Sequence, residues 1–97
     1  MKKEMDKAVA LGYDPAIGAP EVVAAARGLL VGKLMELARR HGIPVYRDPD
    51  LAEVLSAAMP GTQVPETLFR AVAAVMAYCY RVNDGFRKKT GKTAIEA

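Results

Sequence analysis

Residues 8–15 read Ala-Val-Ala-Leu-Gly-Tyr-Asp-Pro, a short apolar run that ends in turn-forming residues. Such a run is typical of a buried β-strand. Two prolines and a glycine between residues 14 and 20 exclude regular structure there. The adjacent valines of residues 21–26 favour a second strand, although the alanines of that run would also accept a helix. The fold therefore begins with two consecutive strands.

The clearest periodicity of the chain lies between Leu29 and His41. Its apolar positions recur at helical spacing and predict one inward-facing stripe, made of Leu30, Leu34, Leu37, Ala38 and His41. Gly42 stands at the position expected for a helix C-terminal cap. Residues 43–47 follow as a short extended segment, in which Pro44 belongs at the strand start or on a sheet edge.

Two further helices are predicted after this strand. Asp48 and Pro49 form a helix N-cap followed by a first-turn proline, and Pro65 with Glu66 opens the last helix in the same favourable way. The last helix is expected to end near residues 83–85, with an inward stripe formed by Leu68, Val72, Val75, Met76 and Cys79. Residues 86–97 are polar and basic, and we expect a tail or a frayed helical extension there.

The chain of 97 residues is long enough for one domain. We expect a flexible N-terminus at residues 1–6, a single folded domain at residues 7–84 and a basic tail at residues 85–97. The predicted fold class is α/β (α+β), a small single sheet of about three strands flanked by three helices. The expected order is strand, strand, helix, strand, helix, helix.

Composition excludes several classes of protein. With 52% hydrophobic and 26% charged residues the chain is neither wholly disordered nor of membrane type. Its longest apolar run, Ala71 to Tyr80, is far shorter than the ~20 residues of a membrane span, so we expect a cytoplasmic protein. The net charge of +3 arises entirely after residue 80, because residues 1–80 hold nine basic and nine acidic side chains.

No catalytic or metal-binding set is evident in the sequence. A single cysteine, Cys79, and a single histidine, His41, cannot form a four-ligand zinc site, and no nucleophile, base and orienting group share a local spacing. Gly91-Lys92-Thr93 matches the end of a phosphate-binding loop, but Phe86 stands where that loop requires glycine. We therefore expect no enzyme activity, no metal and no cofactor.

Three separated segments carry a more specific signal. They are residues 8–15, the run Ala-Pro-Glu-Val-Val-Ala at residues 19–24 and His-Gly-Ile-Pro-Val at residues 41–45. In this order they resemble the C-terminal cytoplasmic domain of the FlhB/YscU family, the substrate-specificity switch proteins of the flagellar and type III secretion export apparatus. Further matches in the last two helices extend the resemblance over about residues 7–83.

The resemblance implies a further strand and a cleavage sequence upstream of residue 7. In the family an Asn-Pro-Thr-His sequence precedes this strand and is cut by attack of the Asn side chain on its own carbonyl. Residues 3–6 of this chain are Lys-Glu-Met-Asp, and its only asparagine is Asn83, so we expect no self-cleavage. We expect a stand-alone copy of the cleaved domain that lacks the first strand and has an open sheet edge at Ala8, Val9, Ala10 and Leu11.

The resemblance also implies a docking patch for export substrates or their chaperones. By position the patch consists of Ala19 and Pro20 in the turn and Ala73 and Met76 in the last helix, although a methionine at helical spacing is more often a core residue. The partners implied are export-gate membrane components and export substrates or chaperones, at the cytoplasmic face of the inner membrane. Homodimerisation or strand exchange would use the open edge.

Two alternatives stay open at the level of sequence, a nucleic-acid-binding protein and an enzyme of a kind that the sequence does not reveal. Arg87, Lys88, Lys89 and Lys92, with Phe86 nearby, would suit a small nucleic-acid-binding protein. Four cations in a flexible tail are ordinary, and we expect no nucleic-acid partner.

Overall fold

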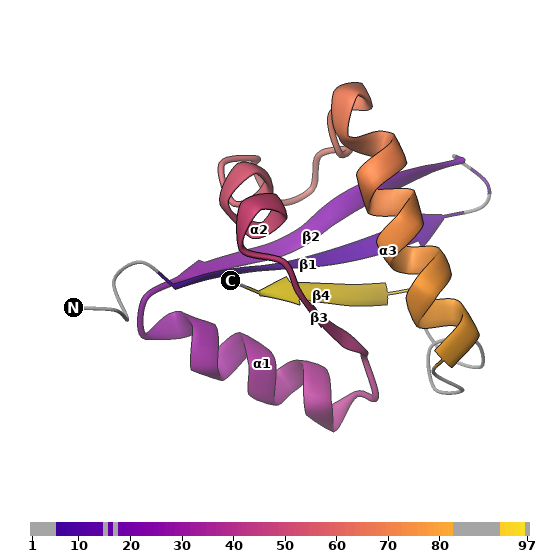
Figure 1. Ribbon diagram of the computed structural model, residues 1–97. Coiled ribbons are helices and arrows are strands. Elements are labelled where there is room, and N and C mark those ends of the chain that lie inside the picture. Colours follow the sequence, from indigo (N-terminus) through magenta and orange to yellow (C-terminus); the bar gives the residue numbers. More distant parts are fainter. Residues whose placement is uncertain (1–5, 15, 17, 83–91, 97) are drawn as a thin grey trace.

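The computed structural model describes residues 6–14, 16, 18–82 and 92–96. The elements follow one another as β1 (Lys7–Asp14), β2 (Ala19–Arg27), α1 (Leu30–Arg40), β3 (Val45–Arg47), α2 (Pro49–Leu55), the 3₁₀ turn η2 (Glu66–Leu68), α3 (Phe69–Val82) and β4 (Lys92–Glu96). The predicted fold class and the order of the first six strands and helices are confirmed. Figure 1 shows one sheet with the helices packed around it.

The sheet has four strands in the order β2-β1-β4-β3, one more than the sequence predicts. β1 pairs antiparallel with β2 on one side and antiparallel with β4 on the other, and β3 joins β4 in parallel. β4 therefore occupies an internal position of the sheet, although it follows every other element in the chain (Figure 1).

The predicted open edge at Ala8–Leu11 is wrong. Ala8 lies opposite Glu96 of β4 and Leu11 lies opposite Thr93, so the whole of this segment is paired on both sides. The expected tail is wrong at the same place, because Thr93, Ala94 and Ile95 are buried in the sheet. The physical reason is long-range pairing, since these residues find their partners about 80 positions earlier in the chain. Residues 8–11 therefore offer no free edge for strand exchange.

The hydrophobic core lies between the sheet and the pair of helices α2 and α3. Val9 and Leu11 of β1 are fully buried in it together with Ile95 of β4. Successive side chains of a strand point to opposite faces, so Ala10 faces the other side of the sheet. That other face is the one against which α1 packs.

The helix ends follow local chemistry. The Asp48 side chain accepts a hydrogen bond from the backbone N–H of Leu51 (3.1 Å) and caps α2 as predicted, and Pro49 occupies the first helical turn. α1 ends where Gly42 adopts a φ of 67°, a left-handed conformation that glycine accepts without strain. The last helix differs from the prediction at its start, because η2 precedes α3 and the α-helix proper begins at Phe69.

Candidate functional site

The docking patch predicted from the resemblance is divided between two neighbouring elements. Ala19 and Pro20 open β2, and α3, which carries Ala73 and Met76, packs against that strand (Figure 1). Ala19, Pro20 and Met76 are buried, and Met76 belongs to the hydrophobic core. Ala73 alone of the four is exposed. A partner on this surface would therefore meet Ala73 first.

The start of β2 is held in place by the loop that precedes η2. The backbone N–H of Val64 donates to the Pro20 carbonyl (2.9 Å), and the Val22 N–H donates to the Thr62 carbonyl (2.8 Å). Proline suits this position because β2 is an edge strand, where a missing N–H removes no ladder bond. The loop covers the outer edge of β2 here, so the surface near Pro20 is rigid.

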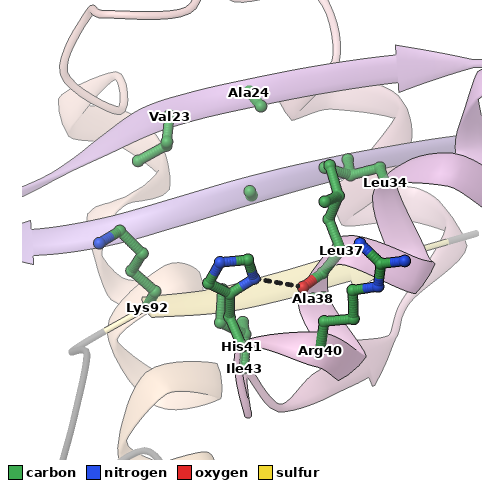
Figure 2. A pocket seen from close by; sticks show the side chains of 10 residues that line it. Val23, Ala24, Leu34, Leu37, Ala38, Arg40, His41, Ile43 and Lys92 are labelled. Carbon is green, nitrogen blue, oxygen red and sulfur yellow. Dashed lines mark hydrogen bonds between the residues drawn. The ribbon is translucent and has the colours of Figure 1, made fainter.

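A second candidate surface lies on the opposite face of the sheet, where α1 leaves an apolar groove of about 550 Å³. Ala24 lies on the sheet side of the groove, and Leu34 and Leu37 of α1 form one wall (Figure 2). Ala10 of β1, which pairs with Ala24, also lines the groove and forms its floor with that residue. Sequence reasoning missed this groove. It predicts the apolar stripe of α1 but assumes that the sheet covers the stripe, whereas Leu37 is 45% exposed and Leu30 is 62% exposed.

An irregularity in β2 shapes the floor of the groove. Ala10 lies opposite Ala24 and Leu11 lies opposite Val22, so Val23 is an extra residue, a β-bulge. In a regular strand neighbouring side chains point to opposite faces, but here Val23 and Ala24 both line the groove (Figure 2). The bulge thus adds an apolar side chain to this face of the sheet.

The rim of the groove is basic. Arg40 and His41 stand at the C-terminal end of α1, and Lys92 of β4 lies across from them (Figure 2). Nδ1 of His41 lies 2.9 Å from the Leu37 carbonyl, which holds the ring against the end of its own helix. The residues that line the groove include no carboxylate, so its electrostatic potential favours an anionic group.

One ion pair links the N-terminal end of β1 to α2. Lys7 Nζ donates to Glu53 Oε1 at 2.7 Å. The hydrogen bond and the charge of Lys7 hold the pKa of Glu53 below its ordinary value. Because Glu53 is exposed to solvent, this pair contributes little to stability.

The single thiol is a core group. Cys79 is buried on α3, and burial raises the pKa of its thiol. Within the described part of the chain, Thr93 Oγ1 is fully buried and completes no hydrogen bond. A protonated, enclosed thiol is a poor nucleophile, so the geometry gives Cys79 no chemical role.

The other motifs of the sequence gain no site from the fold. Lys92 and Thr93, from the phosphate-loop match, lie in β4, and Gly91 lies outside the described residues. Arg87, Lys88 and Lys89, on which the nucleic-acid alternative depends, also lie outside them. The described residues hold no cluster of His, Cys, Asp or Glu that could ligate a metal. In the same residues, every helix is too short or too polar to cross a membrane.

Comparison with known proteins assigns the chain to a family. Residues 5–79 match the family described as FlhB HrpN YscU SpaS. The chain belongs to this family. The match begins just before β1 and ends within α3, so it contains both elements of the predicted patch. The resemblance seen in the sequence is thereby confirmed.

Individual relatives fall into two size classes. An uncharacterised protein of Bacillus subtilis, YlqH, is 31% identical over 84 residues, which cover 86% of this chain and 90% of YlqH. The flagellar biosynthetic protein FlhB of Aquifex aeolicus is 40% identical over 73 residues, or 73% of this chain and 21% of that protein. FlhB of Salmonella typhimurium is 38% identical over 76 residues, which cover 76% of this chain and 20% of that protein. The chain thus spans most of YlqH but about a fifth of each FlhB.

Proposed function

We propose that this chain is a non-enzymatic protein-interaction module of the flagellar or type III export apparatus, which docks export substrates or their chaperones. Its membership in the FlhB family supports an export-related role. The observation that carries the proposal is the match over residues 5–79, because it includes the start of β2 and the part of α3 where the patch residues lie.

The chain performs this role without self-cleavage. Residues 3–6 are Lys-Glu-Met-Asp, so the asparagine side chain that the resemblance makes the attacking group is missing. β4 fills the position beside β1, so β1 is paired on both sides by strands of the same chain. The domain therefore acts in one state, equivalent to the cleaved form of its larger relatives, beside the export-gate membrane components at the cytoplasmic face of the membrane.

The contact surface of this module is centred on Ala73. Its small side chain lets an apolar residue of the substrate approach α3 closely, whereas Ala19, Pro20 and Met76 are buried. Each Å² of apolar surface removed from water contributes roughly 25 cal/mol. A surface that exposes one small residue of the patch supports weak, transient binding, which suits a substrate that must be released into the export channel.

The test is a binding measurement with a matched pair of variants. Purified chain is immobilised, and binding of an export substrate from the same organism, alone and with its chaperone, is measured by biolayer interferometry. Ala73→Glu places a charge on the patch and is expected to weaken binding at least tenfold. Ala71→Glu is the control, because residue 71 is also exposed on α3 but points to nearly the opposite side of the helix from residue 73, about 160° away.

Circular dichroism confirms that both variants remain folded. If the wild-type chain binds neither the substrate nor its chaperone complex, the proposed docking role is wrong. If Ala71→Glu and Ala73→Glu weaken binding equally, the role stands but the patch does not.

A further inference from the structure

The groove between α1 and the sheet is an apolar surface that the described chain leaves uncovered. The side chains of Leu37 and Val23 are both more than 40% exposed, and they face each other across the alanine floor (Figure 2). On soluble proteins, a large contiguous patch of exposed apolar surface is a mark of a binding site. The volume of about 550 Å³ lies within the roughly 300–1,000 Å³ of ligand pockets.

The charge of the rim restricts what can bind. Arg40 lines the groove and makes no ion pair with any residue in the described ranges. Arg39 and Lys33 add further positive charge on the same helix, and Glu36 is the one carboxylate of α1. An occupant with apolar side chains and carboxylates is therefore complementary both to the walls and to the rim.

Occupants built from this chain are disfavoured by the same charges. A second copy docked on this face in a symmetric dimer would bring two copies of the basic rim, with Arg40 and Lys92, into one interface. Residues 83–91 carry three basic side chains and one acidic one, and residues 1–5 carry two basic and one acidic, so the net charge of each segment has the wrong sign for this rim. A flat lipid surface would touch Leu37 but would not reach the floor, where Ala10 is only 8% exposed.

We propose that the groove between α1 and the sheet binds a short segment of a partner protein in which apolar side chains stand next to carboxylates. The apolar side chains fill the space over Ala10 and Ala24, and a carboxylate pairs with Arg40. The site lies on the face of the sheet opposite α3, so it goes beyond the docking patch at Ala73 and does not rest on it.

The experiment begins with an unbiased probe. A phage-displayed library of random twelve-residue peptides is selected on the immobilised full chain, and enriched peptides are synthesised with a fluorescein label. We expect the enriched peptides to combine leucine, isoleucine or phenylalanine with aspartate or glutamate. Fluorescence polarisation then measures their dissociation constants.

Two matched pairs of variants locate the binding. Leu37→Glu introduces a charge into the groove wall, whereas Leu30→Glu makes the same change at a more exposed position of α1 outside the groove. Arg40→Glu reverses a charge on the rim, whereas Arg39→Glu reverses the neighbouring charge that does not line it. We expect a loss of affinity of tenfold or more for Leu37→Glu and of threefold to tenfold for Arg40→Glu, with less than twofold changes in the controls.

Salt and lipid separate the remaining explanations. Raising NaCl from 50 to 500 mM is expected to weaken peptide binding severalfold, because it screens the pairing of the carboxylate with Arg40. The proposal is overturned if no peptide is enriched, if the enriched peptides are basic, or if Leu30→Glu and Leu37→Glu weaken binding equally. If no peptide is enriched, and if the chain sediments with anionic phosphatidylglycerol vesicles but the Leu37→Glu variant does not, the groove is instead a membrane contact.

Discussion

Replacement of Ile95 by alanine tests whether residues 92–96 are a structural strand or a tail. Ile95 of β4 is fully buried, opposite Val9 of β1 on one side and Tyr46 of β3 on the other. Its side chain also belongs to the core cluster that α2 and α3 cover. The residue thus joins both halves of the sheet to the core, and its truncation should lower the free energy of unfolding of the whole domain.

The magnitude follows from the atoms removed. Ile→Ala deletes three carbon atoms, and each buried methylene contributes about 0.8 kcal/mol. The lost transfer free energy is therefore about 2.4 kcal/mol, and the unfilled space left beside Val9 adds to it, which places the total near 3 kcal/mol. Domains of this size are stabilised by roughly 5–15 kcal/mol, so the variant keeps its fold but loses a large part of its stability.

Urea unfolding followed by circular dichroism measures the effect. With a dependence of about 1.5 kcal/mol per M of urea, the midpoint of Ile95→Ala should fall by about 2 M. Val54→Ala is the control, since Val54 is an aliphatic residue that is 52% exposed on α2 and its truncation should change the midpoint by less than about 0.5 M. Equal midpoints for the two variants would refute the internal position of β4.

Three further outcomes are expected. Thr93→Val should raise the free energy of unfolding by about 1 kcal/mol, because valine removes a buried hydroxyl that lacks a partner. Thr62→Val is the control, because it deletes a hydroxyl that donates to a backbone carbonyl and should not stabilise the domain. Thermal melts compare the two variants, and a lower melting temperature for Thr93→Val than for the wild type would contradict the prediction. Cys79 should react with Ellman's reagent at pH 8 only after urea is added, because its thiol is buried and its pKa is raised; rapid reaction of the native protein would show an open core. The pKa of Glu53, followed by NMR, should lie below its ordinary value and should rise in Lys7→Gln. Since the folded pKa is lowered, the stabilisation by this ion pair is present at neutral pH and is lost as the pH falls through the folded pKa. An unchanged pKa of Glu53 in the variant would show that Lys7 is not the cause of the shift.

The parts of the fold that sequence predicts well are those with local causes. α2 begins at Asp48 and Pro49 because a capping carboxylate and a fixed φ act within one turn. α1 ends at Arg40, just before Gly42, because a left-handed residue there terminates the helix. Met76 belongs to the core, as the periodicity of its helix indicates. The signals for the two helix ends come from residues within a few positions, and the signal for Met76 comes from the periodicity of its own helix.

β4 could not be found in this way. Its five residues include only two strand formers, Thr93 and Ile95, and they follow a basic polar segment that resembles a tail. They form a strand because β1 and β3 offer backbone partners on both sides, including a hydrogen bond from the Ala94 N–H to the Pro44 carbonyl (2.9 Å). Strand propensity depends strongly on such surroundings, so the local sequence alone carries almost no signal.

The groove depends on a combination of three elements. The sequence shows the leucines of α1, but how much of them the sheet covers depends on how the helix packs. The bulge that turns Val23 toward the groove arises from a register shift between β1 and β2, which no residue type announces. The exposure of Leu37 therefore emerges only from the assembled structure.

The internal position of β4 has a consequence for how the protein is made. Translation delivers residues 92–96 after every other element, yet β3 pairs only with this strand among the described residues. Until the ribosome releases that segment, β3 has no neighbour and one side of β1 presents unpaired backbone groups, a template for pairing with other nascent chains. The sheet is consequently completed only after residues 92–96 have left the ribosome, through contacts of long sequence separation that form slowly. Aggregation during synthesis, rather than instability of the finished domain, is the hazard that this topology creates.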